Sequence, residues 1–215
     1  MILKKEIYPK TPRLSCNGEK IHVTEKLDGS NLCIFKKDDK VYFAQRKRIY
    51  DLDEVKALDD KERSNLYKGL YQWLIDNESV LRDIHEGSVL CGEWLGMGCL
   101  KYSVDEFDKR FYMFAKARIT DDFTLTNRQF DHEQFHWCFD SQELPSCIGI
   151  VPEVCELNVL PNKEHLDSVY NKYCEKVKRN VEGFVIEYKN TITKYVRMKN
   201  GVLQEHFDRE EKDNE

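Results

Sequence analysis

The sequence has no stretch of residues long and apolar enough to span a bilayer. Its first residues, Met1–Glu6, lack the apolar segment of a secretory signal peptide. The formal net charge is −5, so the chain has no basic excess, and contact with nucleic acid would require a local basic patch. We therefore expect no membrane partner and a cytoplasmic location, or an intracellular one in the host if the source is viral.

No Cys-x-x-Cys pair occurs, although the chain has eight cysteines. Cys33 and Cys91 lie inside apolar strand patterns, and no secretory signal directs the chain to an oxidising compartment. We therefore expect reduced cysteines that pack in the core rather than disulfides. The eight residues are Cys16, Cys33, Cys91, Cys99, Cys138, Cys147, Cys155 and Cys174.

Neither an internal repeat nor a Gly/Ser-rich linker divides the chain, so we expect one domain over residues 1–200 and a short charged tail over residues 201–215. Apolar alternation predicts strands, and the strands and helices interleave without regular βαβ spacing. This order favours an α+β fold with largely antiparallel sheets. The predicted strands are Lys20–Lys26, Leu32–Lys37, Val41–Gln45, Ser88–Leu95, Arg110–Ile119, Ile148–Val159, Phe184–Tyr188 and Thr191–Lys199.

Three segments are predicted to be helical. Leu66–Ile84 carries apolar residues at helical spacing, and Lys163–Lys178 also reads as a helix. Thr126–Gln129 has the pattern of a capping box, which predicts a helix that begins there and continues through Trp137.

The run Glu25–Asn31 joins two predicted strands and reads Glu-Lys-Leu-Asp-Gly-Ser-Asn. Lys26 therefore lies where one predicted strand ends and before the next one begins. A lysine amine becomes a nucleophile when it is deprotonated, and burial near other cations favours that state. Gly29 would let the backbone approach a bulky ligand closely. An isolated Lys-x-Asp-Gly is more often a surface turn, so the assignment depends on motifs farther along.

Further charged and aromatic residues follow Lys26 in a defined order, most of them on or beside predicted strands. They are Arg46 within Gln45–Arg48, Glu93 within Cys91–Leu95, Phe114 within Phe111–Phe114, Glu182 within Glu182–Ile186, and Arg197 and Lys199 within Arg197–Asn200.

Together these segments resemble motifs I, III, IIIa, IV and V of the covalent nucleotidyltransferase superfamily, which contains polynucleotide ligases and mRNA capping enzymes. Ser30-Asn31 after the Lys-x-Asp-Gly tetrad resembles the RNA ligase branch that seals nicks in duplex RNA and includes the RNA-editing ligases. The resemblance covers about Ile21 to Asn200. It implies a ligase adenylation-domain fold, with sheets that flank a nucleotide cleft.

The resemblance implies an ATP-dependent RNA ligase that joins 3′-hydroxyl and 5′-phosphate ends through a lysyl-AMP intermediate and an adenylated 5′ end. Lys26 would be the nucleophile. Glu93 would bind a ribose hydroxyl, and Phe114 would stack on adenine. Arg46 would contact a phosphate or the ribose. Glu25, Asn31 and Glu182 complete the expected nucleotide-binding set, with Arg197 and Lys199.

A catalytic Mg²⁺, or Mn²⁺, is expected through water on Asp28, Glu93 and Glu182. Arg197 and Lys199 would neutralise charge at the α-phosphate. Motif V in RNA ligases is typically Lys-x-Lys, so Arg197 departs from it, and a planar guanidinium is not a point charge. Residues 201–215 are too few for the OB-fold or other C-terminal domain of many relatives, so a separate partner could supply RNA binding.

Alternatives remain beside these roles. Glu93 could be a structural carboxylate, Arg46 part of a solvated basic edge, and Phe114 a core residue with Tyr112 as the next candidate. His132–His136 matches the His-Glu-x-x-His pattern of zinc proteases on a predicted helix, but no motif supplies a third ligand. The other functional classes are a capping-type guanylyltransferase that uses GTP and a catalytically inactive relative that binds nucleotide or RNA.

Overall fold

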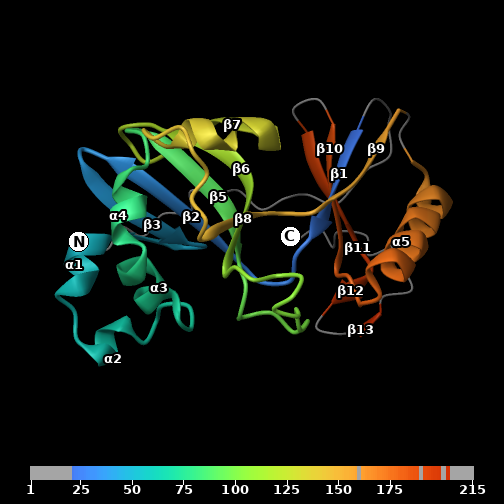
Figure 1. Cartoon of the computed structure of the whole chain (residues 1–215), viewed down its shortest axis with the longest axis horizontal. Helices are drawn as coiled ribbons and strands as arrows, with labels where there is room; N and C mark the ends of the chain where they lie inside the picture. Colours follow the sequence, from blue (N-terminus) through green and yellow to red (C-terminus); the bar gives the residue numbers. More distant parts are fainter. Residues whose placement is uncertain (1–20, 159–160, 189–190, 200–201, 204–215) are drawn as a thin grey trace, which may run out of the picture. The chain divides into compact units, whose positions relative to one another are not determined.

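The computed structural model describes residues 21–158, 161–188, 191–199 and 202–203 (Figure 1). This part of the chain forms two compact units. The large unit is Asp28–Val151, and the small unit combines residues 21–27 with residues 152–203. The chain passes from the small unit to the large one between Leu27 and Asp28, and it returns between Val151 and Pro152.

The large unit is built on a seven-stranded sheet in the order β4-β3-β2-β5-β6, with β7 and β8 both paired with β6. β8 runs parallel to β6, and the other neighbours are antiparallel. The strands are β2 (Ser30–Lys37), β3 (Lys40–Gln45), β4 (Arg48–Asp51), β5 (Ser88–Trp94), β6 (Phe111–Ile119), β7 (Leu125–Gln129) and β8 (Ile148–Ile150).

Short helices cover one face of this sheet, which we call the helix-covered face (Figure 1). Buried leucines of these helices pack on strand residues such as Leu32 and Leu90. The burial of these apolar surfaces is the main term that holds the layers together. The covering helices are α1 (Leu52–Lys56), α3 (Leu70–Asp76), α4 (Glu78–Arg82) and the 3₁₀ helix η1 (His132–Cys138), whereas α2 (Asp60–Arg63) has no buried residue.

The opposite face of the sheet carries a second cluster, because side chains alternate along each strand. Cys33 and Phe35 of β2 lie on this face beside Val89 and Cys91 of β5, and all four are fully buried. Partly buried side chains, including that of Phe114, pack against the cluster.

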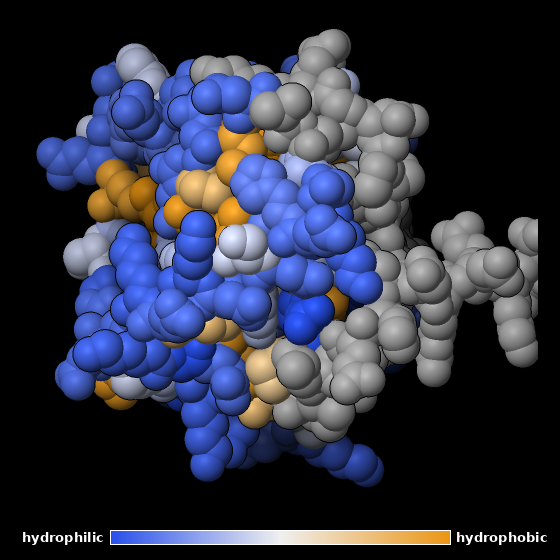
Figure 2. Space-filling view, turned by 90° about the vertical axis from the view of Figure 1, so that its right-hand side faces the viewer, coloured by the Kyte–Doolittle hydropathy of each residue, from blue (hydrophilic) through white to orange (hydrophobic). Residues whose placement is uncertain are grey.

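The small unit contains an antiparallel sheet in the order β11-β10-β1-β9 and the helix α5 (Lys163–Val177). Leu166, Tyr170 and Tyr173 of α5 pack against Phe184 and Tyr195 of the sheet. The outer residues of α5 are mostly charged or polar, and Figure 2 shows a largely hydrophilic surface on this side. The strands are β1 (Ile21–Lys26), β9 (Glu153–Leu157), β10 (Gly183–Tyr188) and β11 (Thr191–Val196), with β12 (Met198–Lys199) paired with β13 (Val202–Leu203).

The fold is a mixture of helices and mostly antiparallel sheets, as the sequence predicted, and the predicted strands are present with small shifts at their ends. β4 was not predicted. Ile148–Val159 is interrupted at Val151-Pro152 to give β8 and β9, and Val159 lies outside the described residues. Thr191–Lys199 is interrupted at Arg197 to give β11 and β12, which belong to different sheets. Of the predicted tail over residues 201–215, the structure describes only Val202 and Leu203, which form β13.

The single helix predicted over Leu66–Ile84 is wrong. Two short helices, α3 and α4, occupy this segment, and they are separated at Asn77. α3 begins only at Leu70 because Gly69 adopts a left-handed conformation with φ of 77°. The spacing of the apolar residues indicates which of them face the sheet, but it does not indicate the break between the two helices.

The helix predicted from a capping box at Thr126–Gln129 is also wrong. This segment forms β7, in which Thr126 pairs with Arg118 of β6, and Asn127 has φ of 50°. The helical turns begin only at His132, where Asp131 is the capping residue and its side chain accepts a hydrogen bond from the Glu133 backbone N–H at 3.1 Å. Pairing with β6 therefore overrides the local capping pattern.

No helix in the described ranges has the length and apolar character needed to cross a membrane. The seven cysteines in these ranges are free thiols, and Cys16 lies outside them. Burial raises the pKa of the Cys138 thiol to about 12.

Candidate active site

Lys26 is the last residue of β1 and pairs with Gly183, the first residue of β10. This register brings the Lys26 side chain beside Glu182, the residue before β10. The Lys26 Nζ atom lies 2.6 Å from Glu182 Oε2, and the two side chains are 23% and 15% exposed. Nucleophile candidate and carboxylate thus form a partly buried ion pair at the ends of neighbouring strands.

Glu25 precedes Lys26 and points to the opposite face of β1, toward α5, because residues alternate along a strand. Its carboxylate is buried and bound by Arg179, with 2.6 Å from Nη1 to Oε1 and 2.6 Å from Nη2 to Oε2. The Tyr173 hydroxyl donates to Oε2 at 2.8 Å. The Glu25 carboxylate is therefore occupied by protein groups.

Arg197 follows β11 and binds α5. Its Nη1 atom lies 2.9 Å from Asp167 Oδ1, and its guanidinium lies 5.6 Å from the centre of the Tyr170 ring. The Tyr195 hydroxyl also donates to Asp167 Oδ1, and burial, with this hydrogen bond, raises the pKa of Tyr195. The Arg197 Nε atom is buried and has no hydrogen-bond partner among the described residues. The side chain of Lys199, on β12, is outside the described part of the structure.

Asp28 is hydrogen-bonded to the loop between β5 and β6. Its Oδ2 atom accepts hydrogen bonds from the backbone N–H groups of Cys99 at 2.6 Å and Leu100 at 2.7 Å. Its own N–H donates to the Tyr102 hydroxyl at 2.6 Å. The loop approaches so closely that a Cβ atom at Gly98 would lie 2.0 Å from the Asp28 carbonyl oxygen. One carboxylate oxygen of Asp28 therefore organises this loop.

Gly29 and Glu93 connect β2 to β5. The Gly29 N–H donates to Glu93 Oε1 at 3.2 Å, and a Cβ atom at Gly29 would lie 2.4 Å from the Trp94 carbonyl oxygen. The close approach that Gly29 permits is thus made to β5. Asn31 pairs directly with Glu93, in step with Cys33 and Cys91, so both polar residues lie on the opposite face of the sheet.

Phe114 reaches this same face through an irregularity in β6. Cys91 pairs with Ala115 and Gly92 pairs with Met113, so Phe114 is an extra residue between them. Such a bulge turns a side chain to a face that simple alternation would deny it. Phe114 is partly buried and packs against the cluster that contains Cys91 and Ala115. Asn31, Glu93 and Phe114 therefore share one face of the sheet.

Arg46 and Lys47 form the two-residue turn between β3 and β4, and both side chains are exposed. Beside this turn, the Tyr67 hydroxyl donates to the Asn31 carbonyl oxygen at 3.1 Å. Burial raises the pKa of Tyr67, which also interacts with the Arg46 backbone and Ser30. Tyr67 therefore links the Arg46 turn to the start of β2.

The His-Glu-x-x-His motif lies in η1, a 3₁₀ helix with three residues per turn, so its histidines at i and i+4 do not share a face as they would in an α-helix. His132 instead lies against Phe135, and His136 lies against Trp137, with ring centres 5.1 and 5.0 Å apart. In the described ranges, no three His, Cys, Asp or Glu residues form a group that could hold a metal ion directly.

The structure brings the predicted residues together in subsets. Within the small unit Lys26 meets Glu182, whereas Glu25 and Arg197 are bound to groups on or next to α5. Within the large unit Asn31, Glu93 and Phe114 share a face, and Asp28 holds the β5–β6 loop. Sequence reasoning missed five supporting residues, because their partners are distant in the chain and no local pattern marks them: Tyr67, Tyr102, Asp167, Tyr173 and Arg179.

Comparison with protein families gives a match to the family model described as RNA ligase over residues 19–200. Because this match spans most of the 215 residues, the chain belongs to the RNA ligase family. A comparison with curated proteins gives no significant match.

Solved structures of Naegleria gruberi RNA ligase have a similar fold. A mutant form with ATP and Mn has a TM-score of 0.53 and 19% identity, over 83% of this chain and 49% of that chain. A mutant apo form has a TM-score of 0.51 and 18% identity over the same shares. The ligase with PPi also has a TM-score of 0.51, with 19% identity over the same shares. This chain thus spans about half the length of those ligases.

Proposed function

We propose that this protein is an ATP-dependent RNA ligase that becomes adenylated on Lys26 and joins a 3′-hydroxyl end to a 5′-phosphate end. The observation that carries the proposal is the pairing of Lys26 with Glu182 at the ends of β1 and β10, in a chain of the RNA ligase family. The Glu182 carboxylate fixes the Lys26 nitrogen and can accept the proton that the amine must lose before an in-line attack.

The reaction has three phosphoryl transfers. The Lys26 amine, after losing its proton, forms a bond to the α-phosphorus of ATP, and the bond from that phosphorus to the pyrophosphate oxygen breaks. An oxygen of the RNA 5′-phosphate then takes the AMP, and the Lys26 nitrogen leaves. Finally the 3′-hydroxyl attacks the activated 5′-phosphate and AMP leaves. Positioning and charge neutralisation supply most of the catalysis in such transfers.

The large unit supplies the nucleotide contacts in this proposal. Glu93 accepts a hydrogen bond from a ribose hydroxyl, and Asn31 lies opposite it on β2. Phe114 stacks on the adenine, because its ring is on the same face and only partly buried. Arg46, exposed at its turn, contacts a phosphate or the ribose. Glu25, in the small unit, keeps its expected place in the nucleotide-binding set as the neighbour of Lys26, although its carboxylate is bound by Arg179.

A divalent cation fits the donor set, because carboxylate oxygens are the ligands that Mg²⁺ and Mn²⁺ prefer. Asp28, Glu93 and Glu182 would hold it through water, and the ion would supply charge neutralisation at the phosphates. Arg197 and Lys199 would add positive charge at the α-phosphate. The Arg197 Nη1 atom is held by Asp167, whereas its Nε atom makes no hydrogen bond to the residues that the structure describes.

The RNA substrate in this proposal is a nicked duplex, bound by a local basic surface that includes Arg46, Lys47 and Arg48. Contacts of this kind are made to phosphates, so sealing would depend little on sequence and would weaken as salt rises. With the chain about half the length of the matched ligases, a separate partner or segment would strengthen RNA binding.

The decisive experiment is mass analysis of the purified protein after incubation with ATP and Mg²⁺ or Mn²⁺. The proposal requires a mass increase equal to AMP that maps to Lys26, and its absence from a Lys26→Ala variant. Incubation with GTP distinguishes a capping-type guanylyltransferase. A protein that takes up neither nucleotide on Lys26, yet binds ATP or RNA, would be an inactive relative and would contradict the proposal.

A further inference from the structure

The carboxylate of Glu25, the residue before the proposed nucleophile Lys26, is held by three hydrogen bonds from protein side chains. The Glu25 side chain is fully buried, and the Arg179 side chain that binds it is only 13% exposed. Both guanidinium Nη atoms bind the carboxylate at 2.6 Å, and the Tyr173 hydroxyl adds a third hydrogen bond at 2.8 Å. A buried carboxylate is costly unless it is paired in this manner.

This network acts on the main chain at the point where Lys26 leaves β1. Pairing of β1 with β9 is irregular between Val23 and Thr24, and the Glu25 N–H instead donates to the Pro152 carbonyl oxygen at 2.8 Å. The end of β1 is therefore outside the regular ladder on its β9 side. The side chain of Glu25 provides the additional restraint there, and Lys26 projects from the other face of the same short segment.

Stability alone does not account for such a pair. A buried ion pair is often no more stabilising than well-packed apolar residues of similar volume. Tyr173, which binds Glu25, and Phe184, which pairs with it across β1 and β10, belong to a buried apolar cluster that could pack around an apolar replacement. What a bidentate pair adds is a fixed direction and distance, because the planar guanidinium matches both carboxylate oxygens.

We propose that Arg179 and Tyr173 are positioning residues for the first chemical step. They hold Glu25, and through it the main chain of β1, so that the Lys26 amine is aligned for attack on the α-phosphate. This inference rests on the proposed function. It goes beyond that function because it assigns a role to two residues that lie outside motifs I to V and do not touch the nucleotide.

The test uses a double variant, Glu25→Leu with Arg179→Met, which replaces the ion pair with apolar residues of similar size. Three quantities are compared with wild type: the urea midpoint of unfolding, the rate of lysyl-AMP formation with its KM for ATP, and the rate of sealing of a pre-adenylated RNA strand. Sealing of that strand does not use Lys26 as a nucleophile, so a general folding defect would lower both rates together.

The positioning role predicts that the double variant folds with a midpoint close to wild type. Its maximal rate of lysyl-AMP formation should fall by about 10- to 100-fold, with KM for ATP changed less than about threefold, as expected when a reacting group is misplaced by about 1 Å. Sealing of the pre-adenylated strand should fall much less. The rate of lysyl-AMP formation of Arg179→Lys should lie between those of wild type and the double variant. Lysine keeps the positive charge but lacks the two parallel N–H donors of the guanidinium.

Arg82→Met is the matched control, because it removes an arginine that pairs with carboxylates in the large unit, away from these motifs. It should leave both rates unchanged. Equal lysyl-AMP rates in wild type and the folded double variant would overturn the positioning role and leave the proposed function intact, and so would an equal loss of both rates. Wild-type protein that forms no lysyl-AMP on Lys26 would overturn both proposals.

Discussion

The Lys26 amine and the Glu182 carboxylate approach to 2.6 Å, although 156 positions separate the two residues in the chain. Antiparallel pairing of β1 with β10 accounts for the contact, because it sets Lys26 against Gly183. A carboxylate at this distance fixes the amine and is close enough to exchange a proton with it. Binding of ATP would therefore bring phosphate charges beside an amine that already pairs with the Glu182 carboxylate.

Glu182→Gln should slow lysyl-AMP formation by about 10- to 100-fold while the protein remains folded. The amide retains a hydrogen-bond acceptor for Lys26 but loses the charge that holds the amine and, in our proposal, the hydrated metal ion. Rapid-quench labelling with radioactive ATP measures the effect. Glu175→Gln, at an exposed position on α5, is the control and should label at the wild-type rate. A Glu182→Gln variant that labels as fast as wild type would exclude Glu182 from the first step.

Variants of Asp28 should separate its role in the loop from its proposed role at the metal ion. Asp28→Ala removes the acceptor for two backbone N–H groups and should lower the free energy of unfolding by about 2–3 kcal/mol. Asp28→Asn keeps an acceptor oxygen, so it should cost only about 1 kcal/mol, yet it should slow labelling at least about tenfold because the charge is lost. Urea unfolding and ATP labelling measure the two effects.

Asp83→Asn is the matched control for this experiment, since Asp83 also accepts from a backbone N–H group, that of Ser141. It should leave labelling unchanged. If Asp28→Asn is labelled at the wild-type rate, the Asp28 carboxylate only stabilises the loop between β5 and β6, and the proposal that Asp28 binds the metal ion is wrong.

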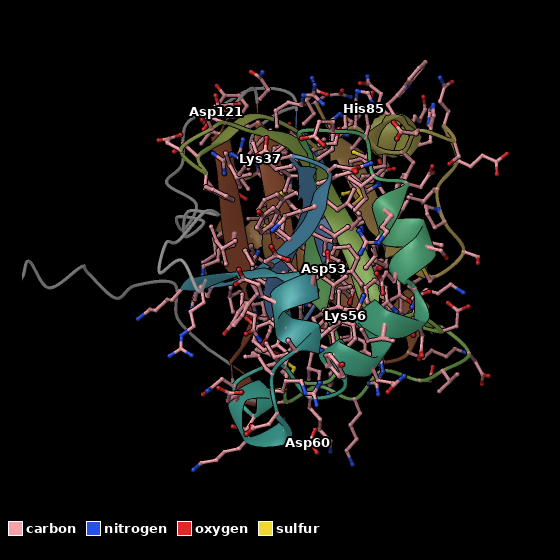
Figure 3. The ribbon with its side chains drawn as sticks, turned by 90° about the vertical axis from the view of Figure 1, so that its left-hand side faces the viewer. Lys37, Asp53, Lys56, Asp60, His85 and Asp121 are labelled. Carbon is pink, nitrogen blue, oxygen red and sulfur yellow. The ribbon has the colours of Figure 1, made fainter. Side chains whose placement is uncertain are left out.

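Acid stability should depend on an ion network between α1 and α4, where Asp53 and Lys56 lie side by side (Figure 3). Hydrogen bonds from Lys56, then from Arg82, lower the pKa of Glu78 from 4.5. Since its pKa is depressed in the folded state, Glu78 stabilises the fold above pH 4.5, and this contribution is lost as pH falls through the folded-state value.

Glu78→Gln should thus cost about 0.5–1 kcal/mol at neutral pH and almost nothing at pH about 2. Urea unfolding of both proteins across this pH range measures the difference. A gap that stays constant with pH would show that the effect does not arise from the ionised carboxylate.

The strands could be predicted from sequence because a short run of apolar residues is a local property, and β2, β3, β5 and β6 each contain one. The Lys26 motif was equally visible, because its residues are consecutive. The break at Asn77 and the strand at Thr126 could not be predicted, since pairing and packing with distant segments decide them.

The candidate site shows the same division. Arg179 lies 154 positions from Glu25, so no spacing in the sequence marks the pair. Phe114 was selected through the resemblance to known motifs, whereas its placement on the same face as Glu93 depends on a bulge opposite Cys91 and Gly92. A bulge adds one residue to one strand, and this is a property of the paired strands together.

Phe114→Leu should weaken ATP binding while leaving the maximal rate of lysyl-AMP formation within about threefold of wild type. Stacking of a base on an aromatic ring is worth about 1–3 kcal/mol, so KM for ATP should rise roughly tenfold. Phe123→Leu is the matched control, because Phe123 packs against the same cluster and contacts Phe35 and Tyr42. Its loss should lower stability comparably without raising KM. If both variants raise KM equally, the aromatic ring of Phe114 contributes through packing of the sheet face, and Tyr112 becomes the next residue to test for adenine contact.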